Sequence, residues 1–496
     1  PSDMRKLIIR SHFTIDRNEH TMIGIILDDN VYEQDIRELL MAFYPGEKFV
    51  HQKTEGTEFD VKGTPGAGVY RLELDGDAVE FPVPEGDRLE TKNRIKRNLY
   101  RLLEKRTGRS LPWGTLTGIR PTKIPMTKLE EGWSREEIAD FMKETYFAGD
   151  DKIALSVEIA ERERELLSRI SYENGYSLYV GIPFCPTTCL YCSFTSYPIG
   201  KWGKRMDEYL GALFRELEYT ADRMKGKVLD TVYFGGGTPT SLSAEHLDQV
   251  IAKVEELFDL SGVQEFTVEA GRPDSITREK LEVLKRHGIT RISINPQTMN
   301  QKTLDVIGRR HTVDMVKEKF ALAREMGFDN INMDLIIGLP GERMEDVAHT
   351  LEEVRRLSPD SLTVHSLALK RAARLNLEWD QYADMGMVNT QEMIDLTARF
   401  AREMGMEPYY LYRQKNMAGN FENVGYSLPG KACIYNILIM EEMQTIAACG
   451  AGTTTKVVFP QENRRERTEN VKDVDQYIQR IDEMIERKEK LLSQIV

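Results

Sequence analysis

The chain has 496 residues, of which 41% are hydrophobic and 30% charged, and its formal net charge is −13. This length favours two or three domains over a single core, and the acidic balance disfavours bulk affinity for nucleic acid or membranes. No apolar run approaches the ~20 residues that span a bilayer, and no signal peptide opens the chain, so we expect a cytoplasmic protein. Its five cysteines, an odd number, do not form a disulfide framework.

Residues 1–165 are expected to form a separate α+β domain. Alternating runs at Val69–Leu74 and Val79–Val83 predict strands. A helical stretch at Lys92–Arg109 carries eight Lys or Arg residues against one Glu. Such a stretch could be an RNA-binding face, but a solvated helix face balanced by acids elsewhere is the more common case. We therefore expect no nucleic-acid partner.

Residues 166–400 alternate between β-rich runs and amphipathic helical patterns. The predicted strands are Ser177–Pro183, Thr231–Phe234, Glu265–Glu269, Arg291–Asn295, Ile331–Ile337 and Ser361–Ser366. The predicted helices between them are Met206–Met224, Ala244–Phe258, Arg278–His287, Val313–Met326 and Met344–Arg356. Repeated strand–helix units predict a parallel α/β fold, a partial TIM-like (β/α)6 barrel with its chemistry at the carboxyl ends of the strands.

Beyond about residue 400 this alternation stops. The sequence becomes rich in Tyr, Asn and Gly, which predicts a loop, and a charged helix at Val474–Ile495 closes the chain. We expect residues 401–496 to be a C-terminal extension that covers the substrate.

Three of the five cysteines lie within eight residues, as Cys185-Pro-Thr-Thr-Cys189-Leu-Tyr-Cys192. Thiolates are the usual ligands of iron–sulfur clusters, and three of them leave one iron of a cubane open for a reacting ligand. Structural zinc would need a fourth ligand nearby, but no His lies within 50 residues of the triplet on either side. The alternative to a cluster is a set of buried structural thiols.

Polar or glycine-rich residues follow the predicted strands. The run Gly235-Gly236-Gly237-Thr238-Pro239 lets the backbone approach a ligand closely and could aim its amides at an anion. Acidic or amide residues at other strand ends, and an arginine in Gly308-Arg-Arg-His, could also contact a ligand; otherwise they are turn or surface residues. These four are Glu269, Gln297, Asp334 and Arg309.

Together these motifs resemble the oxygen-independent coproporphyrinogen III dehydrogenase group of radical S-adenosylmethionine (SAM) enzymes. The similarity rests on Tyr179-Val-Gly-Ile-Pro-Phe-Cys185, Gly235-Gly-Gly-Thr-Pro239, Gly308-Arg309-Arg310-His311 and Asp334-Leu-Ile-Ile-Gly-Leu-Pro340. The HemZ branch is indicated by Leu111-Pro-Trp113-Gly114-Thr-Leu-Thr-Gly118-Ile-Arg120-Pro, Val364-His365-Ser-Leu-Ala-Leu-Lys370-Arg371, Tyr412-Arg413-Gln-Lys415-Asn416 and Asn423-Val-Gly-Tyr426.

The resemblance implies that Cys185, Cys189 and Cys192 ligate a 4Fe-4S cluster whose open iron is chelated by SAM. It implies SAM contacts at Tyr179, Gly236, Gly237, Thr238, Glu269, Gln297, Arg309 and Asp334, of which Tyr179 and Glu269 are the predicted catalytic residues. It also implies reductive cleavage of SAM, followed by oxidative decarboxylation of coproporphyrinogen III propionates to the vinyl groups of protoporphyrinogen IX. An electron donor such as flavodoxin or ferredoxin is the implied partner.

Two positions depart from this group. Phe194 stands where the dehydrogenases have a fourth cysteine, as it does in the related heme chaperones, and Gly181 stands where both usually carry His. The chaperone segment His-Asn-x-x-Tyr-Trp is replaced by Tyr435-Asn436-Ile-Leu-Ile-Met. A heme-binding or heme-trafficking protein on the same scaffold is therefore the alternative. A methylthiotransferase acting on tRNA is disfavoured, because no cysteines precede Cys185.

A substrate with four carboxylates needs cationic partners, and Arg offers a bidentate geometry for them. The candidates follow the sixth predicted strand or lie in the tail, and for each one a solvated charge is the alternative. They are Lys370, Arg371, Arg374, Arg413 and Lys415.

Overall fold

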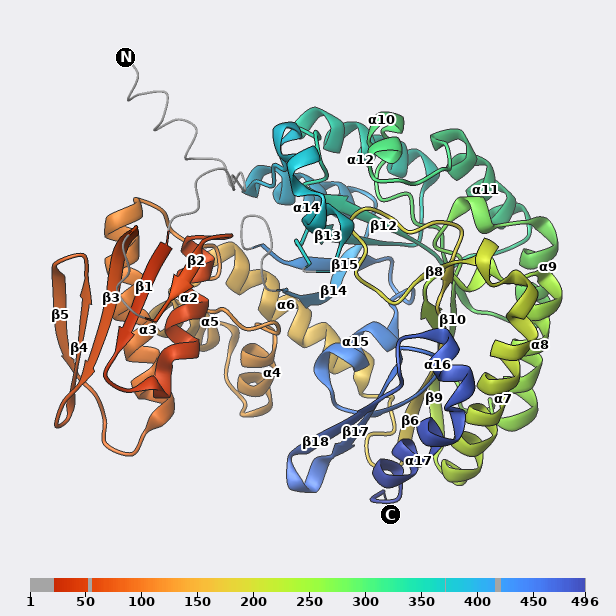
Figure 1. Ribbon diagram of the computed structural model, residues 1–496, viewed down its shortest axis with the longest axis horizontal. Helices are drawn as coiled ribbons and strands as arrows, with labels where there is room; N and C mark the ends of the chain where they lie inside the picture. Colours follow the sequence, from red (N-terminus) through yellow and green to blue (C-terminus); the bar gives the residue numbers. More distant parts are fainter. Residues whose placement is uncertain (1–21, 52–55, 371, 415–420, 496) are drawn as a thin grey trace.

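The computed structural model describes residues 22–51, 56–370, 372–414 and 421–495. Two separate sheets organise this part of the chain, a small one near the N-terminus and a large one that curves through the rest of the molecule (Figure 1). A long helix, α6 (Asp150–Leu167), lies between them.

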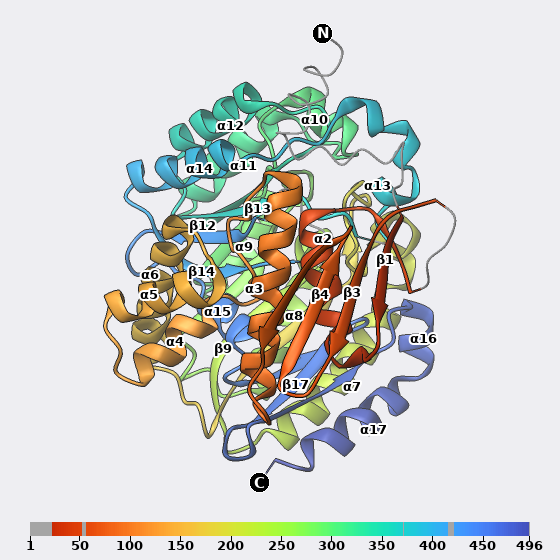
Figure 2. The same ribbon diagram turned by 90° about the vertical axis from the view of Figure 1, so that its left-hand side faces the viewer.

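The N-terminal sheet has the strand order β2-β1-β3-β4-β5. Its strands are β1 (Met22–Leu27), β2 (Lys48–Val50), β3 (Thr57–Pro65), β4 (Val69–Leu74) and β5 (Asp77–Pro82). Helices α2 (Glu33–Phe43) and α3 (Arg88–Thr107) cover one face, and Figure 2 shows the other face turned away from the large sheet. Apolar side chains of both helices and the sheet form one buried core. The expected α+β unit is present, while its boundary at residue 165 stays a prediction.

Acidic residues of the same unit neutralise much of the basic helix α3. Lys105 pairs with Asp77 at 2.7 Å, and Arg106 pairs with Asp75. Lys96, which is buried, donates to the Thr117 hydroxyl at 2.9 Å. These contacts support the interpretation of α3 as a charge-balanced helix face.

A second group of helices joins the N-terminal sheet to the large one. It comprises α4 (Lys123–Glu130), α5 (Arg135–Tyr146) and α6. The motif that begins at Leu111 lies here: the Trp113 indole donates to Glu422 at 2.8 Å, and Glu422 also pairs with buried Lys152 at 2.6 Å. Arg120 donates to the Met440 carbonyl at 2.8 Å. The N-terminal segment is thus fastened to the tail by buried polar contacts.

The large sheet has the order β14-β15-β13-β12-β11-β10-β9-β6-β16-β17-β18. Its consecutive parallel strands are β6 (Gly175–Ile182), β9 (Val228–Gly236), β10 (Glu265–Glu269), β11 (Arg291–Ser293), β12 (Ile331–Ile337) and β13 (Ser361–Ser366). The helices beside them are α7 (Met206–Arg223), α8 (Ala244–Leu257), α9 (Arg278–Arg286), α10 (Gln301–Val306), α11 (Val313–Glu325), α12 (Met344–Leu357), α13 (Arg374–Leu377) and α14 (Gln391–Glu403). Helices α7 to α12 line the outer side of the curved sheet in Figure 1. The predicted partial (β/α)6 barrel is confirmed, and within the described ranges its sheet does not close.

The prediction of a loop beyond residue 400 is wrong. That region forms β14 (Glu407–Tyr412), β15 (Asn423–Ser427), α15 (Ile434–Glu441), β16 (Thr445–Cys449), β17 (Thr454–Phe459) and β18 (Arg464–Glu469). Strand β15 pairs antiparallel with β13, and β16 pairs parallel with β6. The tail therefore covers both edges of the barrel sheet. The pairing of a strand with a sheet edge distant in sequence cannot be predicted from the local hydrophobic pattern.

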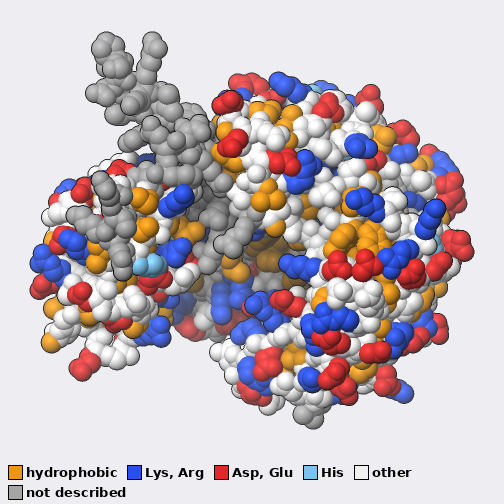
Figure 3. Space-filling view, viewed as in Figure 1, with side chains coloured by type: hydrophobic (Ala, Val, Ile, Leu, Met, Phe, Trp, Pro, Cys, Tyr) orange, Lys and Arg blue, Asp and Glu red, His pale blue; other side chains and the backbone are white. Residues whose placement is uncertain are grey.

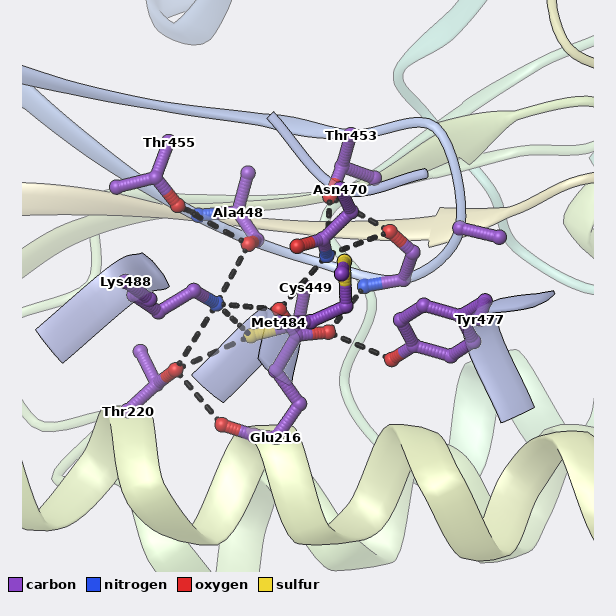
Figure 4. Close-up of polar contacts among 12 residues, drawn as sticks. Glu216, Thr220, Ala448, Cys449, Thr453, Thr455, Asn470, Tyr477, Met484 and Lys488 are labelled. Carbon is purple, nitrogen blue, oxygen red and sulfur yellow. Dashed lines mark hydrogen bonds and ion pairs between the residues drawn. The ribbon is translucent and has the colours of Figure 1, made fainter. Parts of the chain in front are cut away.

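The predicted C-terminal helix is two helices, α16 (Val474–Gln479) and α17 (Ile481–Leu492), and both pack against α7. Figure 4 shows the buried contacts that hold them. Lys488 pairs with Glu216 of α7 at 2.7 Å and lies 3.4 Å from the Cys449 sulfur. Glu216 also accepts hydrogen bonds from Tyr477 at 2.6 Å and Asn470 at 2.7 Å. A satisfied ion pair thus fixes the chain end against the barrel.

A short parallel bridge, β7 (Phe184–Cys185) with β8 (Tyr197–Pro198), brackets the cysteine loop. None of the helices in the described ranges combines the length and the apolar character that a membrane crossing requires.

Candidate functional site

The cysteine loop leaves the barrel directly after β6 and is tied back to the loop after α10. The Leu190 amide donates to the Ile307 carbonyl at 2.9 Å, and the Thr187 hydroxyl donates to the Gly308 carbonyl at 3.2 Å. On its other side, the Leu375 amide of α13 donates to the Leu190 carbonyl at 2.9 Å. These bonds fix the loop over the carboxyl ends of the parallel strands.

The three thiols of the loop differ in their surroundings. Cys185 lies 3.4 Å from the Thr238 hydroxyl, and burial raises its pKa to about 11. Burial also acts to raise the pKa of buried Cys189, but Arg309 and Arg272 beside it outweigh burial and bring that pKa below its ordinary value. Arg272 donates to the Cys189 sulfur at 3.5 Å. One thiol of the three is therefore held in a strongly cationic environment, which favours the thiolate form that iron binds.

The donor set fits an iron–sulfur cluster better than a single ion. In the described ranges, His, Cys, Asp and Glu side chains form no group of three around one metal-ion position. Three thiols on one loop, half-buried or buried, instead suit the corners of a cubane, whose ligands bind separate irons. Cys185, Cys189 and Cys192 would hold such a cluster, and their ligation stays a prediction.

The glycine run packs against the cysteine loop rather than presenting free amides. A Cβ on Gly237 would lie 2.6 Å from the Phe184 carbonyl oxygen, closer than real contacts allow. The Gly237 amide donates to the Ile182 carbonyl at 2.8 Å, and the Thr238 amide donates to the Phe184 carbonyl at 2.7 Å. The idea that these two amides face an anion is therefore wrong, because protein carbonyls already use them. SAM contact at Gly236, Gly237 and Thr238 through other atoms stays a prediction.

Glu269 ends β10 in a tyrosine-lined part of the barrel. It accepts a hydrogen bond from the Tyr233 hydroxyl at 2.6 Å. Burial raises the pKa of Glu269 to about 7, and the nearby Asp334 charge acts in the same direction. Tyr179 and Tyr233 stack with their ring centroids 6.0 Å apart. Both predicted catalytic residues therefore contact Tyr233, Tyr179 through its ring and Glu269 through its hydroxyl.

Sequence reasoning missed a third member of this stack. Tyr435 of α15 stacks on Tyr233 at 4.4 Å and lies 5.9 Å from Tyr179. In the sequence, its segment is distinguished only by its difference from the heme chaperones. A tail residue that enters the barrel carries no local signal, since its partners are more than 200 positions earlier in the chain.

Gln297 and Asp334 are neighbours in space as well as in their predicted role. The Gln297 amide donates to the Asp334 carbonyl at 3.0 Å, and Gln297 has a φ of 68°, a left-handed conformation that side chains rarely adopt. Its side-chain oxygen is buried, and in the described ranges no hydrogen-bond donor reaches it. Burial acts to raise the pKa of Asp334, but His365 and Asn332 outweigh burial and lower it. A strained backbone and an unpaired buried acceptor are features of ligand sites.

His365 is a second residue that sequence reasoning did not single out as functional. Its ring lies 3.2 Å from the Tyr412 hydroxyl through Nδ1 and 3.9 Å from Asp334 through Nε2. Its place in the motif Val364-His365-Ser-Leu-Ala-Leu is the one sequence signal that marks it.

Arg309 is almost fully buried, with 5% of its surface exposed. Its guanidinium donates to the carbonyls of Asn295 and Gly271, the latter at 3.3 Å, while in the described ranges no acceptor reaches its Nε. The predicted site residues Glu269, Gln297, Asp334 and Arg309 thus gather along the carboxyl edge beside the cysteine loop.

The candidate substrate cations are more dispersed. Arg374, the first residue of α13, pairs with Glu378 just after that helix at 3.0 Å. Lys370 is half-buried, and burial lowers its pKa. Arg413 is buried; it donates to the Leu116 carbonyl at 2.6 Å, and burial lowers its pKa to about 10. Arg371 and Lys415 lie outside the described residues. Their contacts with substrate stay predictions.

Figure 3 shows that this face of the molecule is hollowed between the N-terminal unit and the barrel, with Lys and Arg side chains on the lower side of the hollow. Cationic residues at such a hollow would suit a ligand with several carboxylates.

The two positions that depart from the expected pattern have distinct surroundings. A Cβ on Gly181 would lie 2.3 Å from the Thr453 methyl carbon, so the tail fills the space beside β6 that a His would need. Phe194, two residues after Cys192, is 76% exposed.

Comparisons with known proteins agree with this geometry. Residues 179–354 match the Radical SAM superfamily. The chain is 44% identical over 410 residues to the oxygen-independent coproporphyrinogen-III oxidase-like protein HemZ of Bacillus subtilis (strain 168), covering 82% of each chain. It is 39% identical over 195 residues to the heme chaperone HemW of the same organism, covering 39% of this chain and 51% of the relative.

Among solved structures, the coproporphyrinogen III oxidase HemN from Escherichia coli, titled a radical SAM enzyme, is similar in fold. The TM-score is 0.51 at 23% identity, over 65% of this chain and 72% of that one.

Proposed function

The chain belongs to the radical SAM superfamily and, within it, to the oxygen-independent coproporphyrinogen-III oxidase-like proteins, and on this premise we propose that it decarboxylates coproporphyrinogen III. Its cofactors are a 4Fe-4S cluster and SAM. The proposed reaction converts propionate side chains to vinyl groups and yields protoporphyrinogen IX in heme biosynthesis. Each vinyl group requires the loss of one hydrogen atom, one molecule of carbon dioxide and one electron.

The observation that carries this proposal is the three-thiol loop over a strand edge that gathers Glu269, Gln297 and Asp334. When bound, the cluster supplies the electron that cleaves SAM to methionine and a hydrogen-abstracting 5′-deoxyadenosyl radical. Cys185, Cys189 and Cys192 would hold the cluster. The unpaired acceptor of Gln297 would bind a SAM hydrogen-bond donor, and the carboxylates of Asp334 and Glu269 would bind its hydroxyl or ammonium groups.

The protein must also hold the substrate and exclude water from the reacting carbon. Tyr233 and Tyr435 are buried and Tyr179 is half-buried, and we propose that their stacked rings shield the half-buried Glu269 from water. Lys370 and Arg371 follow β13, and we propose that they bind substrate carboxylates, with Arg374, Arg413 and Lys415 as further candidates. The electron donor is proposed to be a flavodoxin or ferredoxin, and the location the cytoplasm. The domain limits at residues 165 and 400 belong to this proposal.

The alternative is heme binding without turnover. It is favoured by one observation, the exposed Phe194 in place of a fourth cysteine, together with the partial similarity to a heme chaperone.

Anaerobic product analysis tests the two functions against each other. Reconstituted protein would be incubated with SAM, a reductant and coproporphyrinogen III, and the tetrapyrroles separated by mass. We expect protoporphyrinogen IX from the wild type and none from Cys189→Ala. A wild type that forms no protoporphyrinogen but binds heme stoichiometrically would establish the alternative.

The substrate residues need a separate measurement. Arg371→Ala or Lys370→Ala should raise the KM for coproporphyrinogen while leaving iron content and SAM binding unchanged. Arg413→Ala is a less specific test of substrate binding, because Arg413 is buried and its loss would also leave the Leu116 carbonyl without its hydrogen-bond donor. Unchanged KM in both variants would place the carboxylate partners elsewhere.

A further inference from the structure

Arg272 is a buried cation beside the cysteine loop to which none of the sequence motifs assigned a role. It lies in the loop between β10 and the short helical turn Pro273–Ser275, and only 2% of its surface is exposed. A buried guanidinium needs partners for its donors, because an unpaired buried charge is strongly unfavourable. The identity of those partners indicates what the residue does.

The guanidinium divides its donors between a carboxylate and the cysteine loop. Nε and Nη2 donate to the two oxygens of Asp274 at 2.9 and 2.7 Å, a bidentate pair. Nη1 points the other way and donates to the Thr187 carbonyl at 3.2 Å and to the Cys189 sulfur at 3.5 Å. Asp274 thus orients the planar group so that one nitrogen faces the loop.

The backbone that carries Arg272 is itself held firmly. The Arg272 carbonyl accepts from the Ser275 amide at 2.9 Å and from the Ser275 hydroxyl at 2.6 Å. The Ser275 hydroxyl also lies 2.7 Å from the Thr240 hydroxyl, and Lys280 donates to the carbonyls of Ser275 and Thr240 at 2.9 and 2.6 Å. The loops after β9 and β10 are therefore joined, and the position of the guanidinium is set before any ligand binds.

The other arginine at this site, Arg309, also lies beside the Cys189 thiol but makes different backbone contacts. Arg309 donates to the carbonyls of Asn295 and Gly271, so it connects two strand-end loops, and the predicted SAM contact would add to these bonds. Arg272 anchors the cysteine loop at the Thr187 carbonyl, and its Nη1 also donates to the sulfur of Cys189, a predicted cluster ligand.

We propose that Arg272 is a positioning residue for the iron–sulfur cluster, and that its N–H···S hydrogen bond to Cys189 raises the reduction potential of that cluster. A donor to a ligand sulfur stabilises the extra negative charge of the reduced state, and such hydrogen bonds are among the factors that set the potentials of these clusters. The inference rests on Cys189 as a cluster ligand and is independent of tetrapyrrole chemistry.

The test uses three variants of the full chain, reconstituted anaerobically without SAM or tetrapyrrole. Arg272→Gln removes both the positive charge and the guanidinium, whereas Arg272→Lys keeps the charge but loses the planar group that binds Asp274 through two hydrogen bonds. Asp274→Asn keeps Arg272 but weakens the contact that orients it. Arg278→Gln is the matched control, since Arg278 also pairs with a carboxylate, Glu325 at 2.8 Å, but on the exposed face of α9. Iron content and the midpoint potential would be measured for each, the potential by redox titration followed by electron paramagnetic resonance.

We expect Arg272→Gln to retain about four irons per chain, because no ligand is lost. Its cluster should be reduced less readily, with an oxidised-to-reduced ratio about tenfold higher at a given ambient potential, or about 59 mV for a one-electron couple. Asp274→Asn and Arg272→Lys should shift less in the same direction, and Arg278→Gln should not shift.

Equal potentials in the wild type and Arg272→Gln would overturn the proposal. If Arg272→Gln does not load iron, Arg272→Lys decides the question: a loaded cluster at the wild-type potential overturns the proposal, and a more negative potential supports it. If neither variant loads iron while Arg278→Gln does, Arg272 is a residue for loop folding and the tuning role is overturned.

Discussion

Two regions of this molecule place a buried cysteine beside a buried cation and a carboxylate, and they serve different ends. In the C-terminal cluster of Figure 4, Cys449 lies beside Lys488, which is paired with Glu216, and burial raises the pKa of the Cys449 thiol to about 11. In the cysteine loop, two arginines lower the pKa of Cys189 despite its burial.

The two regions differ in whether their buried polar atoms have hydrogen-bond partners within the protein. Glu216 has a partner for each oxygen in Lys488, Tyr477, Asn470 and the Gly450 amide, so the C-terminal cluster is complete within the protein. At the strand edge, the Gln297 side-chain oxygen is buried, and no hydrogen-bond donor among the described residues reaches it. A cation near a thiol is therefore not by itself a sign of a metal site. Several thiols on one loop, next to unpaired polar atoms, are the better indication.

The largest expected effect is loss of the cluster. Changing Cys185, Cys189 or Cys192 to Ala should abolish bound iron and SAM cleavage, because each removes a ligand. Cys449→Ala and Cys433→Ala should retain about four irons per chain, since both thiols are buried in structural surroundings. Iron analysis and the visible spectrum after anaerobic reconstitution measure this. Loss of iron in Cys433→Ala would contradict the assignment.

The C-terminal cluster should matter for stability instead. Lys488→Met leaves the buried Glu216 carboxylate with its hydrogen bonds but without a counter-ion, which should cost about 3–5 kcal/mol of unfolding free energy. Denaturant unfolding of the apoprotein measures it. The control is Lys490→Met on the same helix, where the pair with Glu486 is exposed and should contribute little to stability. A stable Lys488→Met variant that cannot bind iron would reverse the roles of the two regions.

The half-buried carboxyl of Glu269 should make the stability of the protein depend on pH. Glu269 has a folded-state pKa of about 7 against an ordinary value of 4.5, so above pH 4.5 the unfolded chain loses a proton that the folded chain keeps. Stability should therefore fall as the pH rises from 4.5 to about 7 and then level off. At about 1.4 kcal/mol per pKa unit, the Glu269 contribution is at most about 3 kcal/mol.

Unfolding curves across this pH range, compared with those of Glu269→Gln, isolate the contribution of the carboxyl. The variant should lose most of the pH dependence in this window. Parallel curves for the two proteins would show that Glu269 titrates normally.

A smaller effect is expected for SAM affinity. Asp334→Ala and Gln297→Ala should keep their iron and bind SAM roughly ten- to hundredfold more weakly, because one hydrogen bond to a charged ligand contributes about 1.5–3 kcal/mol. Gln301→Ala, on the exposed start of α10, is the control and should bind normally. Equilibrium binding to the reconstituted protein measures the difference. Unchanged affinity in both variants would mean that these strand ends serve structure.

Local pattern predicted the barrel well because its strands are buried on both faces. The bounds of Glu265–Glu269, Ile331–Ile337 and Ser361–Ser366 were predicted as the structure has them, since apolar runs between helices mark parallel strands directly. The prediction for the tail failed even though β15 and β16 are also buried throughout. Gly425 breaks the pattern of β15, yet a Cβ there would meet the Tyr410 ring, a contact that only the folded structure reveals.

The candidate site could likewise be predicted only in part from the local sequence. Side chains at successive strand ends could be expected together, because parallel strands meet at one edge. Arg272 and Tyr435 could not, since the first acts through a hydrogen bond to a distant loop and the second enters the barrel from the tail.

The most direct test of the proposed reaction follows a hydrogen atom. Coproporphyrinogen III deuterated on its propionate carbons would be incubated anaerobically with the reconstituted protein, SAM and reductant, and the 5′-deoxyadenosine analysed by mass spectrometry. The proposal predicts deuterium in 5′-deoxyadenosine in step with the formation of protoporphyrinogen IX, and neither product from Cys189→Ala. Cleavage of SAM that gives only unlabelled 5′-deoxyadenosine, with the tetrapyrrole unchanged, would contradict it.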